Sequence, residues 1–165
     1  MYADFEYYST EYGGKMSADD YKRFSRRAED YLDCLTGGKL DFAFPTNEKA
    51  AGKVKRCLCT FADFIQRVDA YQQMAADSMG TVAQSDGSMR GRVITSISSG
   101  SESVGYSATA SFGTDVENAA KSEEGMQAEL CKKAKPIIGG VPDANGVNLL
   151  YAGAYPARKG NYENN

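Results

Sequence analysis

The sequence of 165 residues predicts a small, mainly helical bundle of about three helices, with a short β-hairpin or extended loop insertion and extended N- and C-terminal arms. Two stretches on either side of Gly37-Gly38 repeat apolar residues at spacings of three and four, which is typical of amphipathic helices. Between residues 90 and 112, a run rich in Ser, Thr and Gly carries β-branched and aromatic residues near every second position. A compact chain of this length buries roughly 70% of the surface that it exposes when unfolded, so one domain with one core is expected.

Residues 1–16 are predicted to form an aromatic arm, because several aromatic residues precede the helix breaker Gly13-Gly14. Tyrosine combines a large apolar ring with a polar hydroxyl, so an arm of this kind docks on a protein surface. That surface can belong to the same domain or to a neighbouring subunit, and the sequence leaves both alternatives open. The candidate docking residues of the arm are Phe5, Tyr7, Tyr8 and Tyr12.

A helical hairpin is predicted over residues 17–73. Ser17 can cap the first helix by accepting a hydrogen bond from the backbone of Asp20, and Gly37-Gly38 ends it. Its apolar stripe comprises Tyr21, Phe24, Ala28, Tyr31, Leu32 and Leu35.

The second helix of the hairpin is predicted to begin near Thr46 or Asn47 and to run for about seven turns. Each large side chain buried along it contributes about 1.5 to 3 kcal/mol, so the two helices together are expected to form most of the core. Its apolar stripe comprises Ala51, Val54, Leu58, Phe61, Ala62, Ile65, Val68 and Tyr71.

A linker and a β-ribbon are predicted over residues 74–114. The linker runs from Met74 to Gly91, and the ribbon consists of two strands joined by a turn at Ser98–Ser101. An isolated two-stranded ribbon is marginal in water, so this one needs a surface to lie against. We expect it to form an assembly interface with another chain through Glu102, Ser103, Val104, Gly105 and Tyr106.

A third helix is predicted over residues 115–138, capped near Thr114 and ending close to Pro136. A C-terminal tail follows over residues 139–165, apolar at first and then polar and basic.

The composition argues against an enzyme. The chain has no histidine, which removes Ser-His and Cys-His catalysis and histidine metal sites. The four cysteines have no CxxC spacing and are interpreted as small, partly buried side chains of a reducing cytosol. No catalytic, cofactor-binding or metal-binding residue is therefore predicted.

The net charge and the hydropathy of the chain indicate which kinds of partner are disfavoured. The net charge of -3 argues against binding nucleic acid over the whole surface. No window approaches the roughly 20 apolar residues of a membrane span, and the acidic, aromatic N-terminus is unlike a signal peptide. We expect a protein that is cytosolic when made and has no membrane partner.

Several short blocks, in this order and spacing, resemble the head-to-tail connector (adaptor) proteins of long-tailed bacteriophages and prophages. The resemblance extends over most of the chain. The blocks are Asp4–Tyr8, Tyr12–Gly14, Ala28–Thr36, Val54–Cys57, Ser101–Ser107 and Leu149–Gly153.

This resemblance implies a non-enzymatic virion protein of the head–tail joint that assembles as a ring, commonly of twelve copies. Such a ring binds the portal protein on one side and a stopper or tail-completion protein on the other, and it lines the channel through which DNA passes without sequence-specific binding. The chain departs from the family at Ala152, where an arginine is usual, and in its longer segments 74–91 and 139–146. The residues expected to reach toward the portal are Leu149, Leu150, Tyr151, Tyr155, Arg158 and Lys159.

The alternative from another class is a cytosolic helical DNA-binding or regulatory module. It is motivated by local basic groups, because clustered Lys and Arg side chains can neutralise phosphates even on an acidic protein. Those groups are Lys53, Lys55, Arg56, Arg90 and Arg92.

Overall fold

A computed structural model describes residues 2–77, 79–83, 89–93, 96–99, 102–105 and 113–153. The fold is mainly helical, as predicted, with six helices among these residues rather than about three. The helices are α1 (Phe5–Thr10), α2 (Ala18–Thr36), α3 (Lys39–Phe42), α4 (Glu48–Asp77), α5 (Thr114–Lys121) and α6 (Glu123–Ile138). Two antiparallel ribbons pair β1 (Met79–Ala83) with β2 (Met89–Val93), and β3 (Ser96–Ser99) with β4 (Glu102–Gly105).

Helix α2 has the boundaries that the sequence predicted. The side chain of Ser17 accepts a hydrogen bond from the backbone N–H of Asp20, which satisfies one of the free donors of the first turn. Gly37 ends the helix in the left-handed conformation, at φ 63°, where a side chain would be strained. The predicted apolar stripe is buried at Tyr21 and Leu32 against α4.

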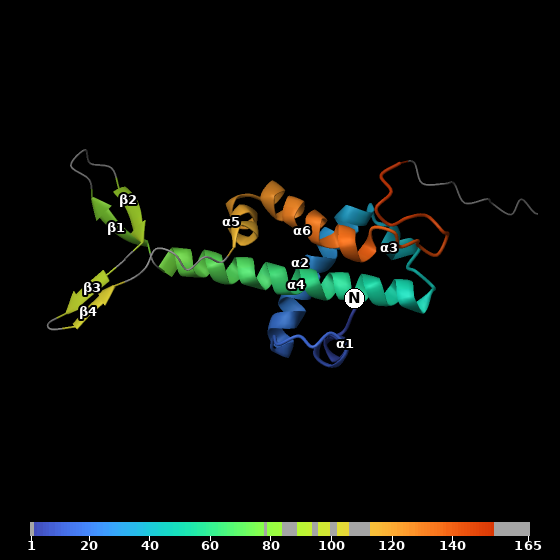
Figure 1. Ribbon diagram of the computed structural model, residues 1–165, viewed down its shortest axis with the longest axis horizontal. Coiled ribbons are helices and arrows are strands. Elements are labelled where there is room, and N and C mark those ends of the chain that lie inside the picture. Colours follow the sequence, from blue (N-terminus) through green and yellow to red (C-terminus); the bar gives the residue numbers. More distant parts are fainter. Residues whose placement is uncertain are drawn as a thin grey trace, which may run out of the picture.

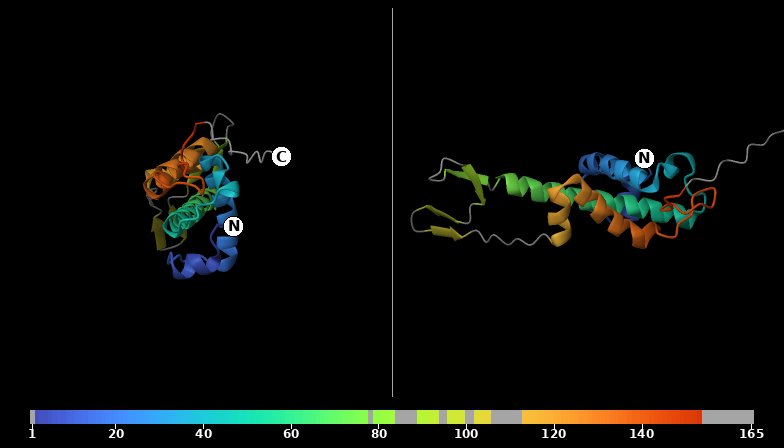
Figure 2. Two further views of the ribbon diagram at one scale, coloured as in Figure 1. Left: turned by 90° about the vertical axis from the view of Figure 1, so that its right-hand side faces the viewer. Right: turned by 90° about the horizontal axis from the view of Figure 1, so that it is seen from above.

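Helix α4 is the longest element, with 30 residues, and the other helices are arranged around it (Figure 1). Its side chains at Val54, Leu58, Phe61 and Ile65 are fully buried. In the views of Figure 2, α2 crosses one side of α4 while α5 and α6 cover another. All three helices are in contact with α4. Together, α2 and α4 supply more than half of the buried core cluster, in line with the prediction that the two hairpin helices form most of the core.

The chain beyond Met74 differs from the predicted linker. Helix α4 continues to Asp77, and β1 and most of β2 also fall within the predicted segment 74–91. Gln and Ala in the last turns of α4 have good helix propensity, so the helix extends beyond the end of its apolar stripe. The ribbons therefore lie beyond the C-terminal end of α4 (Figure 1).

The predicted ribbon is present in β3 and β4. Its register places Ile97 opposite Val104 and Ser99 opposite Glu102. Ser98 and Ser99, predicted as part of the turn, therefore belong to strand β3. Tyr106, the last residue of the predicted ribbon interface, lies outside the described residues.

The predicted third helix is two helices. Ser122 interrupts it with an extended backbone at φ -159°, and its side chain caps α6 by accepting from the backbone N–H of Gly125. A Cβ at Gly125 would lie 2.3 Å from the backbone oxygen of Asn118, so only glycine allows α5 and α6 to meet this closely. Pro136 lies inside the last turn of α6, which ends at Ile138.

Within the described residues, no helix combines the length and the apolar character that spanning a bilayer would need.

Candidate functional site

The N-terminal arm packs on its own subunit. Tyr8 is buried, and its hydroxyl donates to Oδ1 of Asp63 at 2.6 Å. The hydroxyl of Tyr12 donates to Oδ2 of the same carboxylate at 2.9 Å. Of the two alternatives left open by the sequence, docking on the same domain is the one seen for these two tyrosines.

The other two predicted arm residues are less enclosed. The hydroxyl of Tyr7 lies 3.4 Å from the backbone oxygen of Gly52, and the ammonium of Lys55 lies over its ring. Phe5 is 37% exposed and touches the rings of Tyr8 and Tyr21 at its inner edge. Phe5 is therefore the predicted arm residue that presents the most apolar surface to solvent.

The start of the chain is held by carboxylates of α2 and α3. The backbone N–H of Tyr2 donates to Glu29, and its hydroxyl lies 2.7 Å from Oδ1 of Asp33 and 2.9 Å from Oδ1 of Asp41. Burial raises the pKa of Asp33, and the negative charge of Asp41 adds to this effect. One hydroxyl hydrogen thus serves two acidic groups, and sequence reasoning did not anticipate this arrangement.

The predicted portal-contact segment divides into a buried part and an exposed part. Leu149 is fully buried in the core, so its expected role in touching a partner is wrong: the apolar side chain packs inside its own subunit. Leu150 is partly buried, whereas Tyr151 is 52% exposed. Tyr155, Arg158 and Lys159 lie outside the described residues.

A buried lysine holds this C-terminal segment in place. Lys39 is only 5% exposed, and its ammonium donates to the backbone oxygens of Leu149 at 3.0 Å and Tyr151 at 2.6 Å. The backbone of Ala144 also donates to the oxygen of Ala43, directly after α3. These bonds fix the chain from the end of α6 against α3.

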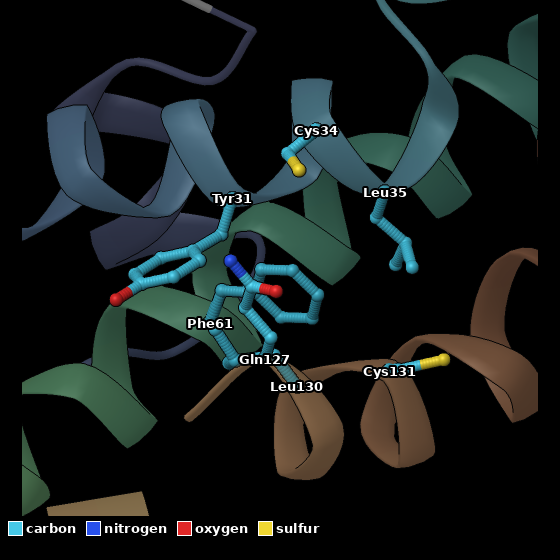
Figure 3. A pocket seen from close by; sticks show the side chains of 7 residues that line it. All are labelled: Tyr31, Cys34, Leu35, Phe61, Gln127, Leu130 and Cys131. Carbon is cyan, nitrogen blue, oxygen red and sulfur yellow. The ribbon is translucent and has the colours of Figure 1, made fainter. Parts of the chain in front are cut away.

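A groove runs along α2, with α6 beside it at one end and the C-terminal segment at the other. We define the α2/α6 groove by three adjoining depressions that share Cys34. The apolar hollow in its middle has a volume of about 210 Å³ (Figure 3). Its lining residues are Tyr31, Cys34 and Leu35 from α2, Phe61 from α4, and Gln127, Leu130 and Cys131 from α6.

The two outer depressions differ in chemistry. One, of about 390 Å³, is polar and includes Arg27, Asp30 and Glu123, with the hydroxyl of Tyr31 donating to Oε1 of Glu123. Burial, together with the bond to Glu123, raises the pKa of Tyr31 to about 12, so this hydroxyl remains a donor at neutral pH.

The third depression, of about 260 Å³, lies at the opposite end of the groove. It is lined by Phe42, which is 51% exposed, and by the C-terminal segment up to Gly153, with the exposed Tyr151 beside it. The groove is thus apolar in the middle, mixed at the end that contains Phe42 and Tyr151, and charged at the other end, which suits a protein segment of mixed character.

The cysteines are reduced and divide into two classes. Cys57 and Cys59 are buried in α4, and burial raises their pKa values to about 12 and about 11, which disfavours the reactive thiolate. Cys34, predicted to be partly buried, is exposed, and Cys131 is half-buried, both in the groove.

Two further observations bear on what the site can do. Among the residues that the structure describes, no group of three or more Cys, Asp and Glu is placed to hold a metal ion. The hollow is also smaller than the roughly 300–1,000 Å³ of typical small-molecule sites. The groove is best suited to receive side chains of a protein.

No known protein family matches the chain, and no curated protein or solved structure shows significant similarity to it.

Proposed function

We propose that this protein is a structural head-to-tail connector of a long-tailed bacteriophage, which forms a ring between the portal and the stopper or tail-completion protein. The proposal rests on the resemblance of the sequence blocks, several of which lie on contacting parts of the fold. DNA passes through the channel of this ring without sequence-specific contacts. The protein acts by binding its neighbours and carries out no chemical step.

The observation that carries the proposal is the separation of the two candidate contact regions along α4. The β1–β2 ribbon begins two residues after α4 ends, whereas Lys39 and Ala43 hold the C-terminal segment near the start of α4. A helix of 30 residues is about 45 Å long. Contact surfaces this far apart allow one subunit to touch two different partners at once.

The two regions also differ in character. The ribbons leave backbone edges, which are suited to pairing with a strand of another chain. The opposite end instead presents the exposed aromatic residues Phe42 and Tyr151 beside a hollow, and aromatic residues are enriched at protein interfaces. We assign the ribbon end to a neighbouring subunit or the tail-side partner and the Tyr151 end to the portal.

A DNA-binding or regulatory module remains the second candidate, and one observation favours it. Lys49, Lys53 and Arg56 are all exposed and follow each other at helical spacing on one face of α4. Such a row can contact phosphates. Binding of the isolated protein to duplex DNA that weakens steeply with salt would support this candidate, whereas a connector ring needs no such binding.

The full-length protein, mixed with the portal protein encoded in the same genome, tests the connector proposal by mass photometry and electron microscopy. We expect a ring of about twelve subunits seated on the portal, the number that the resemblance implies. Val104→Asp should leave the helical content unchanged and prevent this assembly, because it puts a charge into the β3–β4 ribbon. Ala128→Asp, which puts the same charge at an exposed position of α6 outside the predicted interfaces, is the matched control. A protein that stays monomeric beside its portal contradicts the proposal.

A further inference from the structure

We propose that the α2/α6 groove is the docking site of the C-terminal segment 154–162 of the same chain. In this arrangement Tyr155 fills the apolar hollow, and Arg158 and Lys159 lie beside Asp30 and Glu123. The inference does not depend on the connector assignment, because it concerns one subunit by itself.

The first argument is continuity between the chain and the groove. Gly153, the last described residue, lines the depression that also contains Phe42 and Tyr151. Cys34 and Leu35 line both this depression and the apolar hollow. The following residues therefore start at the edge of the groove.

The second argument is that the starting point of this segment is fixed. The buried ammonium of Lys39 holds the backbone oxygens of Leu149 and Tyr151, and the backbone N–H of Leu149 donates to the oxygen of Val141. A segment tethered at a fixed point beside its site binds at a high effective concentration. A modest affinity is then sufficient to keep the groove occupied.

The third argument is the chemistry of the hollow. Phe61, Leu130 and Leu35 form apolar walls, and Figure 3 shows the amide of Gln127 near its rim. A volume of about 210 Å³ suits one large side chain rather than a cofactor. A tyrosine supplies an apolar ring for such walls and a hydroxyl for a polar rim.

The fourth argument is the order of residue types along the segment. Tyr155 comes two residues after Gly153, so it can reach up to about 7 Å from it, toward the adjoining hollow. Arg158 and Lys159 follow three and four residues later, and an extended chain covers about 10 to 14 Å over that distance.

The polar depression begins where the hollow ends, because Tyr31, Cys34 and Gln127 line both. It offers the carboxylates of Asp30 and Glu123 against the single guanidinium of Arg27. A segment that is first aromatic and then basic thus matches a groove that is first apolar and then acidic.

Occupation of the groove has a consequence for assembly. While Tyr155, Arg158 and Lys159 lie on their own subunit, they are not available to another protein. A partner that binds this segment must displace it from the groove, so binding to the partner competes with docking in the groove.

Thiol cross-linking of the full-length protein tests this proposal, because the groove already contains Cys34 and Cys131. Ala154→Cys would place a third thiol beside the hollow and keeps the ring of Tyr155. Ser9→Cys is the matched control, since Ser9 is exposed on α1, on the other side of α4 from α6 (Figures 1 and 2). Each variant is treated in dilute solution with a mild thiol oxidant, which takes up the two electrons released as two thiols join. The products are separated on a non-reducing gel and mapped by mass spectrometry.

We expect Ala154→Cys to form an intramolecular disulfide with Cys34 or Cys131 several-fold faster than the control forms any disulfide. Equal rates in the two variants would overturn the proposal. A disulfide between two chains would overturn it as well, because the groove would then receive the segment of a second copy.

A second measurement needs no new thiol. The docked segment should shield Cys34, so Tyr155→Ala should make the labelling of Cys34 by a maleimide several-fold faster than in the wild-type protein. Asn161→Ala, in the same segment but outside the predicted contacts, should leave the rate unchanged. A Cys34 labelling rate that is the same in all three proteins would contradict docking even if a disulfide could be formed.

Discussion

The hydroxyl of Tyr8 lies 2.6 Å from Oδ1 of Asp63, 55 residues further along the chain. The same hydroxyl oxygen accepts from the backbone N–H groups of Lys15 and Met16, both at 3.2 Å. Tyr8 is buried, so all three bonds replace water that the hydroxyl has lost. This one phenol therefore ties the arm and the turn before α2 to the central helix.

Removing the carboxylate of Asp63 should destabilise the protein. Asp63→Ala leaves the buried hydroxyl of Tyr8 without its acceptor and also frees that of Tyr12, so we expect a loss of about 1 to 3 kcal/mol in the free energy of unfolding. Urea denaturation followed by circular dichroism measures it.

Asp69→Ala on the same helix is the matched control for this prediction. Asp69 forms ion pairs with Arg23 and Arg27 at the surface, and pairs of this kind contribute about 0 to 1 kcal/mol. An equal or larger loss in the Asp69 variant would show that the arm is not held through Asp63.

Alkaline titration should reveal the raised pKa values of Tyr8 and Tyr12 beside Asp63. Burial, with the bond to Asp63, raises the pKa values of Tyr8 and Tyr12 to about 12, above the ordinary 10.0. Between these values the unfolded chain loses protons that the folded chain keeps, so the stabilisation is complete below pH 10.0 and is lost as the pH rises through about 12.

Tyrosinate absorbance and circular dichroism, recorded together, measure this behaviour. We expect part of the tyrosinate signal to appear only as the helices unfold. Asp63→Asn removes the negative charge that helps to raise the pKa values of both hydroxyls. In this variant that part of the signal should shift to lower pH, and unfolding should shift with it. A titration in which every tyrosine ionises near pH 10.0 with the helices intact would contradict the buried position of Tyr8.

The well-predicted elements are those whose signals are local. Ser17 and Gly37 mark the ends of α2 by capping chemistry, and the stripe between them needs only its own periodicity. Helix α3 was missed because its four residues are stabilised by distant contacts, such as the buried Leu40 and the bond from Ala144 to Ala43. Tertiary contacts of this kind leave no periodic pattern in the sequence.

The candidate site was less predictable than the fold. Tyr31 and Phe61 were each predicted as members of an apolar stripe, but the groove arises only where three helices leave the space between them unfilled. Leu149 illustrates the opposite case. An apolar residue in a tail fits its own core or a partner equally well by sequence, and here it fits its own core.

Lys39 should be essential for the position of the C-terminal segment. Lys39→Met keeps the apolar stem and removes the ammonium, so the oxygens of Leu149 and Tyr151 lose their donor; we expect a loss of about 1 to 3 kcal/mol. Amide hydrogen exchange measures the local effect, because the N–H of Leu149, bonded to Val141, should lose protection before α4 does. Lys135→Met, at an exposed position in α6, should change neither quantity. Unaltered protection of Leu149 in the Lys39 variant would assign the segment's position to packing alone.

Two serines of α2 should respond oppositely to the same substitution. Ser25 is fully buried, and its hydroxyl has no hydrogen-bond partner among the residues that the structure describes. Removing a buried, unpaired polar group relieves its desolvation cost, so Ser25→Ala should leave the stability unchanged or raise it. Ser17 caps the helix by accepting from the backbone of Asp20, and Ser17→Ala should cost about 1 kcal/mol. Thermal and urea unfolding of the two variants compares them directly, with each serving as the control for the other. If Ser25→Ala proved the more destabilising of the two, the hydroxyl of Ser25 would have a partner in solution, and the packing between α2 and α4 would need revision at that position.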